Sequence, residues 1–188
     1  DSYFVIAHFH YVLLGGVLLG LMAGLYFWFP KIFGRMPNAG IAYLATGMVI
    51  LGFNLAFGPM HYLGLAGQPR RTHTYHAGNG WETWNYVATI GAFILGLGVF
   101  LAFVNLVYTA FKGVKCASDP WNGRTLEWSL PSPVPEYNFA RSPIIATRDA
   151  FFEHKHGVHQ LAYENDGGEA GVHMPSQSWF PLLAGTGF

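Results

Sequence analysis

Three long stretches of the sequence carry no Asp, Glu, Lys or Arg: 2–30, 36–69 and 83–111. Each is longer than the ~20 residues that an α-helix needs to cross the hydrocarbon core of a bilayer, at 1.5 Å per residue. The pattern therefore predicts three membrane-spanning helices, at about 2–29, 39–66 and 82–111.

Proline and glycine set the expected ends of these helices. The first helix is predicted to end at Phe29–Pro30, because proline cannot continue a helix. The second is predicted to stop before Pro69, and a polar loop rich in Gly and His follows over 67–81. The third is predicted to begin near Trp81.

Aromatic and small residues support the membrane assignment. Gly16, Gly20 and Gly24 repeat on one face of the first helix, a stripe that permits close helix contact unless it only reflects how common glycine is in membrane helices. The aromatic residues near the expected helix ends form the belt typical of membrane interfaces: Tyr26, Phe27, Trp28, Phe29, Tyr62, Trp81, Trp84 and Tyr86.

The charged residues divide the chain into two parts. They make up only 11% of it, against ~25% in soluble proteins, and fourteen of the twenty lie in 112–188. The formal net charge of zero argues against a nucleic-acid binder, and a single cysteine, Cys116, excludes a disulfide scaffold. We therefore predict an all-α membrane protein with an irregular, Pro-rich polar tail.

Three regions follow from this division. Residues 1–113 are predicted to be transmembrane, 114–175 to be a cytoplasmic extension or linker, and 176–188 to be the possible start of a further transmembrane helix. The linker contains a polyproline-like stretch over 129–135 and an acidic, glycine-rich turn over 164–171. Because the sequence starts at Asp1 inside an apolar run, without Met or a signal peptide, we expect it to be a piece of a longer protein.

Basic residues in the short connections predict the orientation. Three helices place Lys31 and Arg35 on the same side as Lys112 and Lys115, and with Arg124, so that side is predicted to be cytoplasmic. The adjacent arginines at 70 and 71 then lie on the opposite side, against the positive-inside rule. Such a pair suggests an anionic partner there.

His8 and His10 carry the strongest chemical signal. Histidines inside a membrane helix are rare and indicate function by default. Two positions apart, their rings point ~200° away from one another, so they cannot chelate one metal but could each ligate the iron of a different haem. The alternative, of about equal weight from these residues alone, is that both are neutral and hydrogen-bonded to neighbouring helices.

Arg70 and Arg71 give the second signal. Guanidinium groups pair with carboxylates in bidentate fashion, and haem carries two propionates. The predicted topology places this pair at the same membrane face as the start of the first helix, which favours propionate binding. The alternative is a pair of side chains that reach lipid headgroups.

Other polar residues carry weaker signals. Asp1 could bind Mg²⁺, although an aspartate at a helix start is more often a cap. For the histidines at 61, 73 and 76 an interfacial position is the favoured interpretation. The tail histidines resemble a loose metal cluster, but a solvated segment is favoured: His154, His156 and His159.

Two motifs resemble a known family. The segment DSYFVIAHFHYVL over 1–13 closely resembles the tenth-helix signature of subunit I of the haem–copper terminal oxidases. The segment FGPMHYLGLAGQPRR over 57–71 resembles the end of the eleventh helix and its loop, and a twelfth helix follows as expected. The resemblance covers about 1–140 and implies that the three helices are the last three of a twelve-helix bundle.

The resemblance implies a role for each candidate residue. His8 corresponds to the proximal ligand of the high-spin haem, and His10 to an axial ligand of the low-spin haem. Arg70 and Arg71 correspond to the propionate-binding pair, and Asp1 to the aspartate of the Mg site. Tyr3 is expected near the propionates of the low-spin haem.

The resemblance also implies an activity. The parent protein would be the catalytic subunit of an aa-type cytochrome c oxidase, a proton-pumping enzyme of the respiratory chain in the bacterial inner membrane. It would pass electrons from cytochrome c through two haems, expected to be haem A, and copper B to oxygen. The copper B ligands lie on earlier helices in this family, so this chain alone is expected to be inactive. The implied partners are membrane lipid and oxidase subunits II and III.

The tail carries weaker resemblances. Residues 119–139 resemble the cytoplasmic extension of bacterial type-A oxidases, and 173–181 resemble the entry to a further helix, as in forms fused to subunit III. Three alternative functions stay open. They are a quinol oxidase of the same superfamily, a non-catalytic di-haem electron-transfer protein, and a transporter-like bundle whose histidines relay protons without haem.

Overall fold

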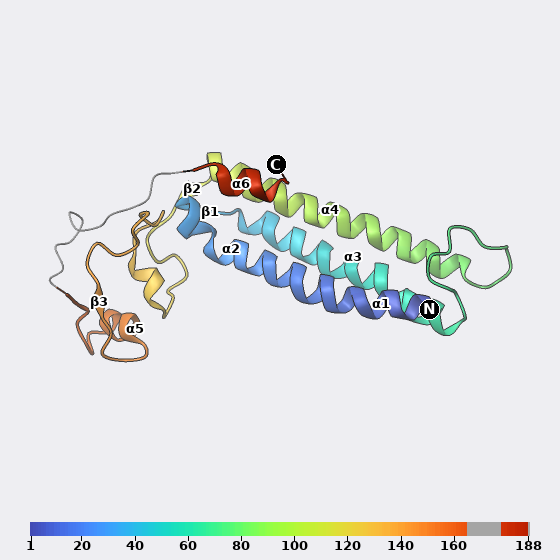
Figure 1. Ribbon diagram of the computed structural model, residues 1–188, viewed down its shortest axis with the longest axis horizontal. Coiled ribbons are helices and arrows are strands. Elements are labelled where there is room, and N and C mark those ends of the chain that lie inside the picture. The colour runs from blue at the N-terminus through green and yellow to red at the C-terminus, as the bar shows by residue number, and fades with distance from the viewer. Residues whose placement is uncertain (165–177, 188) are drawn as a thin grey trace. The chain divides into compact units, whose positions relative to one another are not determined.

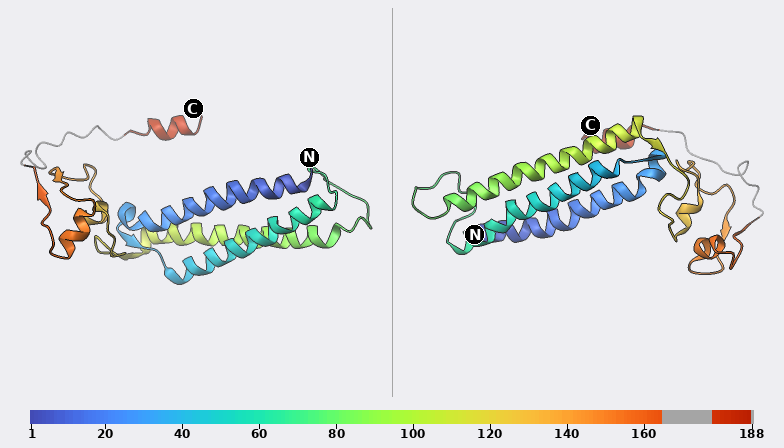
Figure 2. Two further views of the ribbon diagram at one scale, coloured as in Figure 1. Left: turned by 90° about the horizontal axis from the view of Figure 1, so that it is seen from below. Right: turned by 180° about the vertical axis from the view of Figure 1, so that it is seen from behind.

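The computed structural model describes residues 1–164 and 178–187, in two compact units, Asp1–Cys116 and Ala117–Phe188. The first unit consists of three long helices that run side by side (Figures 1 and 2). The first of them is continuous through α1 (Tyr3–Val12), a π-helical turn η1 (Leu13–Leu18) and α2 (Leu19–Phe33). The second is α3 (Ala39–Leu65) and the third is α4 (Glu82–Lys112).

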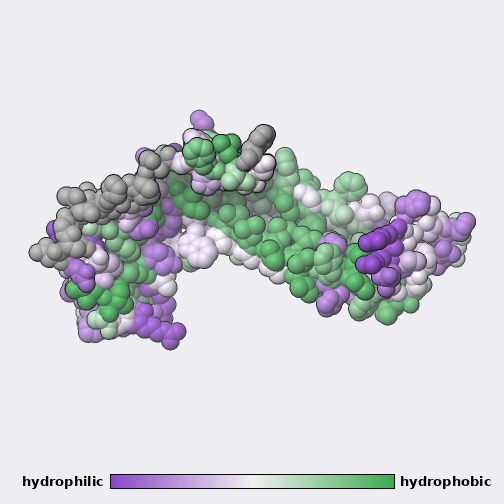
Figure 3. Space-filling model, viewed as in Figure 1, coloured by the Kyte–Doolittle hydropathy of each residue, from purple (hydrophilic) through white to green (hydrophobic). Residues whose placement is uncertain are grey.

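All three helices are long and apolar enough to cross a membrane, and the described residues contain no further helix of this kind. Most of their outward surface is apolar, and the polar side chains gather at the end that carries the N-terminus and the loop after α3 (Figure 3). This confirms the predicted fold class, an all-α membrane protein.

The predicted end of the first helix was wrong. The helix continues through Pro30, whose ring is buried, and ends at Phe33. Proline is tolerated inside membrane helices because neighbouring groups satisfy the carbonyl that it leaves without a partner. The helix ends instead at Gly34, which adopts the left-handed conformation (φ 64°) and donates its N–H to the Pro30 carbonyl at 2.8 Å.

Two short strands, one after α2 and one after α4, pair with each other at one end of the bundle. Strand β1 (Arg35–Met36) pairs antiparallel with β2 (Val114–Lys115), so that Arg35 lies opposite Lys115. The Arg35 guanidinium also donates to the Gly113 carbonyl. These contacts place Arg35 and Lys115 at the same end of the bundle, as the predicted orientation requires, with the loop after α3 at the other end (Figure 1).

A buried asparagine fastens this end of the bundle. The side chain of Asn105, on α4, accepts from the Asn38 N–H at 3.2 Å and donates to the Asn38 carbonyl at 3.1 Å. It also donates to the Tyr26 hydroxyl at 3.3 Å. One amide therefore connects α4 with α2 and with the start of α3.

Glycines let α3 and α4 approach closely, but they are not the predicted ones. A Cβ at Gly52 would meet the backbone of Leu95, and one at Gly91 would meet the backbone of Ala56. The stripe of Gly16, Gly20 and Gly24 makes no such close helix contact within the described residues. The expected close contact at that stripe is therefore not found in this unit.

Replacing Gly91 by alanine is expected to destabilise the helix pair by about 1–3 kcal/mol, because the new methyl group would overlap the α3 backbone. Gly96 lies on the same helix with open space around its Cα, so Gly96→Ala serves as the control. Thermal unfolding of the purified protein in detergent measures both. Equal losses in the two variants would contradict the packing described here.

In the part of the second unit that the structure describes, the elements are short: η2 (Leu126–Ser129), β3 (Pro143–Ile144), α5 (Ala150–Lys155), β4 (Ala162–Tyr163) and α6 (Phe180–Gly185). Strands β3 and β4 pair antiparallel. The Lys155 ammonium donates to the Asp119 carboxylate, to the Asn122 side chain and to the Gly123 carbonyl, at 2.6–2.8 Å. The predicted polar tail therefore holds local structure fastened by one lysine.

Several predictions about the polar tail stay predictions. Among the described residues no group of three or more His, Cys, Asp and Glu side chains is arranged to hold a metal. His156 donates to the Phe152 carbonyl at 2.8 Å, and His159 lies 3.8 Å from Glu153. The acidic turn after Glu164 and most of the resemblance at 173–181 lie outside the described residues. The further transmembrane helix from 176 stays a prediction.

Candidate functional site

The N-terminal segment is fastened to the loop after α3. The Tyr3 N–H donates to the Gln68 carbonyl at 2.9 Å, and the Arg70 N–H donates to the Asp1 carbonyl at 3.0 Å. Between them, Ser2 and Pro69 form an antiparallel β-bridge. The start of α1 and the arginine pair, nearly 70 residues apart in the sequence, are therefore brought together at one end of the bundle.

A glycine makes this approach possible. A Cβ at Gly64, in the last turn of α3, would overlap the backbone of Phe4 in the first turn of α1. Only glycine leaves room for two helix backbones at this distance. The close approach fixes the height of α1, and of the histidines that follow, relative to α3.

His10 is held in a defined orientation. Its Nδ1 lies 2.7 Å from the Ile6 carbonyl oxygen, which can only accept, so Nδ1 is the donor in this contact and Nε2 is the nitrogen left for another partner. The ring also stacks on Phe57 of α3, with centroids 4.3 Å apart and planes 11° from parallel. A neutral imidazole fixed through Nδ1 is the form that coordinates a metal through Nε2.

His8 differs from His10 in its surroundings. Its side chain is exposed and, among the described residues, it makes no hydrogen bond or ring contact. Two residues of helix rotate one ring by ~200° from the other. Phe4, Ala7 and Tyr11 form the line of α1 that meets α3. At ~100° per residue, His8 and His10 lie on opposite flanks of that line, so the two imidazoles can serve different partners.

Arg70 and Asp1 form an ion pair, with Nη2 2.8 Å from Oδ1. The side chains are 36% and 85% exposed, so solvent screens the pair and it adds little to stability. Arginine has five N–H donors, and this contact uses one of them. Arg70 can therefore bind a further carboxylate without releasing Asp1.

Arg71 has a strained backbone. Its φ is +64°, in the left-handed region, which costs an L-residue on the order of 1–2 kcal/mol. The Thr72 hydroxyl donates to the Pro69 carbonyl at 2.7 Å and closes the turn around it. Strain of this kind occurs where a side chain must point in a particular direction, and the Arg71 side chain is exposed.

Two amides beneath the arginines were missed by the sequence analysis. Gln68 is 1% exposed, and its side chain pairs with that of Asn85 on α4. Asn85 Nδ2 donates to Gln68 Oε1 at 2.9 Å, and Gln68 Nε2 donates to Asn85 Oδ1 at 3.4 Å. The only signal in the sequence is that a neutral polar residue directly precedes the Pro-Arg-Arg run, which alone predicts no partner.

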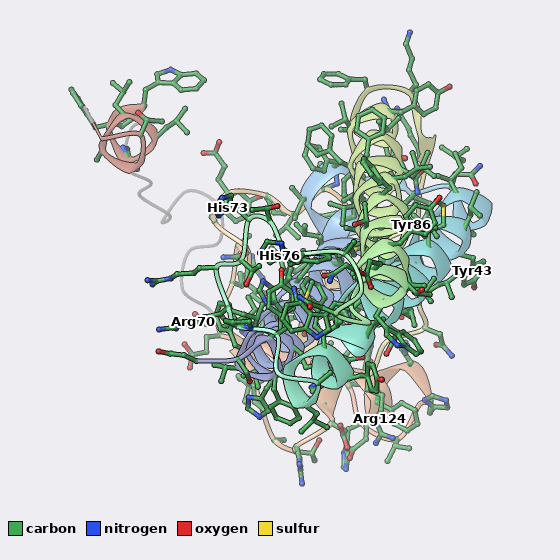
Figure 4. The ribbon with its side chains drawn as sticks, turned by 90° about the vertical axis from the view of Figure 1, so that its right-hand side faces the viewer. Tyr43, Arg70, His73, His76, Tyr86 and Arg124 are labelled. Carbon is green, nitrogen blue, oxygen red and sulfur yellow. The ribbon has the colours of Figure 1, made fainter. Side chains whose placement is uncertain are left out.

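The remaining polar candidates occupy the same end of the bundle. His61 packs edge-on against Phe4 and Tyr11 across the α1–α3 contact, with centroids 5.0 and 5.3 Å away. His73 and His76 are exposed in the loop, on the same side of the bundle as Arg70 (Figure 4). The interfacial position expected for all three stays a prediction.

Comparison with known proteins identifies the family. The model of the family described as cytochrome c and quinol oxidase polypeptide I matches residues 1–94. Cytochrome c oxidase subunit 1 of Alkalihalophilus pseudofirmus is 43% identical over the whole chain, and that of Bacillus sp. strain PS3 is 44% identical. Quinol oxidase subunit 1 of Bacillus subtilis is 38% identical, also over the whole chain.

The chain spans about 30% of the length of these curated relatives. The relatives are bacterial, and with the three apolar helices they indicate a multi-pass protein of the bacterial inner membrane. With the family model matching half of its residues, the chain belongs to polypeptide I of the cytochrome c and quinol oxidases.

Proposed function

We propose that this chain supplies the helix that ligates both haems of a respiratory terminal oxidase, in which electrons from cytochrome c reduce oxygen to water while protons are pumped. The observation that carries the proposal is the arrangement of His8 and His10 on α1, together with the arginine pair fastened to the start of the same helix. The whole enzyme would need the rest of the subunit.

The donor set fits two haems. His10 would ligate the low-spin haem iron through Nε2, because Nδ1 is occupied by the Ile6 carbonyl. His8 would ligate the high-spin haem iron from the other side of the helix, where its ring is exposed. When bound, the haems would supply one-electron transfer and, with copper B, the site of oxygen reduction.

The polar end of the bundle would hold the haem propionates. The Arg70 guanidinium has further N–H donors besides the one that contacts Asp1. Arg71 lies in a turn with a strained backbone, and its side chain is exposed. Tyr3 begins α1 next to Gln68 and would lie near the propionates of the low-spin haem. Asp1, with one carboxylate oxygen on Arg70, would keep the other for Mg²⁺.

Other parts of the oxidase would complete this site. Copper B and the second axial ligand of the low-spin haem would be held by residues outside this chain. Subunits II and III are the proposed partners, and haem A is the proposed haem type. Residues 1–113 contribute apolar helix surface suited to further helices and to lipid.

The electron donor distinguishes two versions of the proposal. Cytochrome c is favoured because relatives named cytochrome c oxidase are 42–44% identical to the chain. Quinol is the second candidate because relatives named quinol oxidase or probable quinol oxidase are 37–40% identical over 95–100% of the chain. A separate copper analysis of the purified complex distinguishes both from a di-haem protein without copper.

We expect the purified full-length enzyme to consume oxygen with reduced cytochrome c and to show little activity with a reduced quinol. Oxygen uptake with each donor, at matched haem content, measures this. Uptake with quinol alone would assign the chain to the second candidate. Absence of haem from the purified protein would contradict the proposed function itself.

A further inference from the structure

We propose that the Gln68–Asn85 amide pair is a positioning clamp that sets the potential of the low-spin haem by fixing the propionate-binding arginines. The inference rests on the proposed function, and nothing in the haem-ligand set requires these two amides. It assigns a role to a partly buried polar pair in which each side chain presents a donor and an acceptor to the other.

The Gln68 side chain is buried. Gln68 is 1% exposed, and a buried amide without partners costs free energy. The Asn85 side chain forms hydrogen bonds with both polar atoms of the Gln68 side chain. It also donates to the Trp81 carbonyl at 3.0 Å. The pair is therefore strongly directional, because rotating either amide breaks both bonds.

Gln68 is bonded to more than one helix of the bundle. The Gln68 backbone carbonyl accepts from Tyr3, and its side chain reaches α4. Arg70 follows two residues later and bonds back to Asp1. Gln68 is thus the residue at which the start of α1, the end of α3 and the start of α4 are joined directly.

The backbone of Arg71 is strained. Arg71 lies three residues after Gln68 with φ +64°, a conformation that persists only when the flanking chain is held. On one flank the clamp fixes Gln68, and on the other the Thr72 hydroxyl binds the Pro69 carbonyl. Without the clamp, the turn that carries both guanidinium groups loses the side-chain support that ties it to α4, while the backbone bonds of Gln68 to Tyr3 and of Arg70 to Asp1 remain.

The proposed effect on the haem is electrostatic. A positive charge near haem iron favours the reduced state, and an arginine that neutralises a propionate acts in the same direction. Arginines that move away from the propionates therefore lower the potential. We expect a three- to tenfold shift of the one-electron equilibrium toward the oxidised haem, which corresponds to about 30–60 mV.

The test is a redox titration of the low-spin haem in the full-length enzyme, compared at equal haem content. Gln68→Met keeps the volume and removes the amide, and Asn85→Leu removes the other half. Each variant is expected to lower the potential by the stated amount, and the double variant no further, because the two residues act as one unit.

The matched control is Asn105→Leu, the same substitution in another hydrogen-bonded asparagine of α4, which is buried and lies at the opposite end of the bundle. It is expected to reduce stability without moving the potential. A comparable potential shift in Asn105→Leu, or none in the clamp variants, overturns the proposal.

A second, milder pair of variants keeps the test decisive if the enzymes with Gln68→Met or Asn85→Leu fail to assemble. Gln68→Asn keeps an amide but shortens its reach, and adding Asn85→Gln restores the combined length. The exchange is expected to recover most of the potential lost in Gln68→Asn. If the exchanged enzyme recovers nothing, or does not assemble, the amides have only a structural role. Absence of haem from the unaltered enzyme would instead refute the proposed function.

Discussion

Replacing His10 by alanine is expected to remove the low-spin haem while the high-spin haem stays bound. The His10 imidazole has its Nδ1 on the Ile6 carbonyl, which leaves Nε2 as the nitrogen that would bind the low-spin haem iron. Alanine offers no ligand, and the neighbouring Phe57 ring cannot replace one. The optical spectrum of the purified full-length enzyme, together with its haem content, measures the loss. Haem per enzyme should fall by about half.

His61→Ala is the control for this change. His61 is also an imidazole near the same end of the bundle, but it packs between Phe4 and Tyr11 and is not proposed as a ligand. Both haems should remain in that variant. An unaltered two-haem spectrum in His10→Ala, or equal loss of haem in the two variants, would contradict the assignment of His10.

Replacing His8 by alanine is expected to give the complementary result, with the high-spin haem lost and the low-spin haem retained. His8 lies on the opposite flank of α1 from His10, and its ring is exposed for a partner outside this chain. Oxygen reduction should cease, because the proposed site of reduction contains this haem. Binding of carbon monoxide to the reduced enzyme measures the high-spin haem separately from the low-spin haem.

The two histidine variants control each other. The rings differ by two positions on one helix, so any general disturbance of α1 should affect both haems alike. The account requires opposite outcomes, with a different haem missing from each variant. Loss of the same haem in both would show that the rings share one partner and would refute the arrangement.

The membrane helices could be predicted from the sequence because the absence of charge over some thirty residues leaves few other structures possible. Helix starts near Ala39 and Glu82 agreed with the prediction to within a residue. The end at Pro30 was wrong, since the rule that proline breaks helices is weaker in a membrane than in water. The π-helical turn over Leu13–Leu18 has no strong local signal at all.

The candidate site was predictable only in part. His8 and His10 stand out because ionisable side chains are rare inside membrane helices, and the arginine pair stands out because it lies against the positive-inside rule. The ion pair between Asp1 and Arg70 and the amide pair of Gln68 with Asn85 depend on how the helices meet. No spacing rule in the sequence connects those partners, so only the structure could supply them.

Packing glycines show the same limit. The stripe at Gly16, Gly20 and Gly24 is the most regular in the sequence, yet it makes no close helix contact in this unit. The close contact of α3 with α4 uses Gly52 and Gly91, which follow no visible repeat. Which face of a helix meets a neighbour is set by the whole bundle and not by the local pattern.

The most direct test of the account is an experimental structure of the full-length protein with its cofactors bound. The account predicts that Nε2 of His10 and Nε2 of His8 each lie within bonding distance of a different haem iron. Both rings turned toward one partner, or a space beside either ring filled by packed side chains, would contradict it.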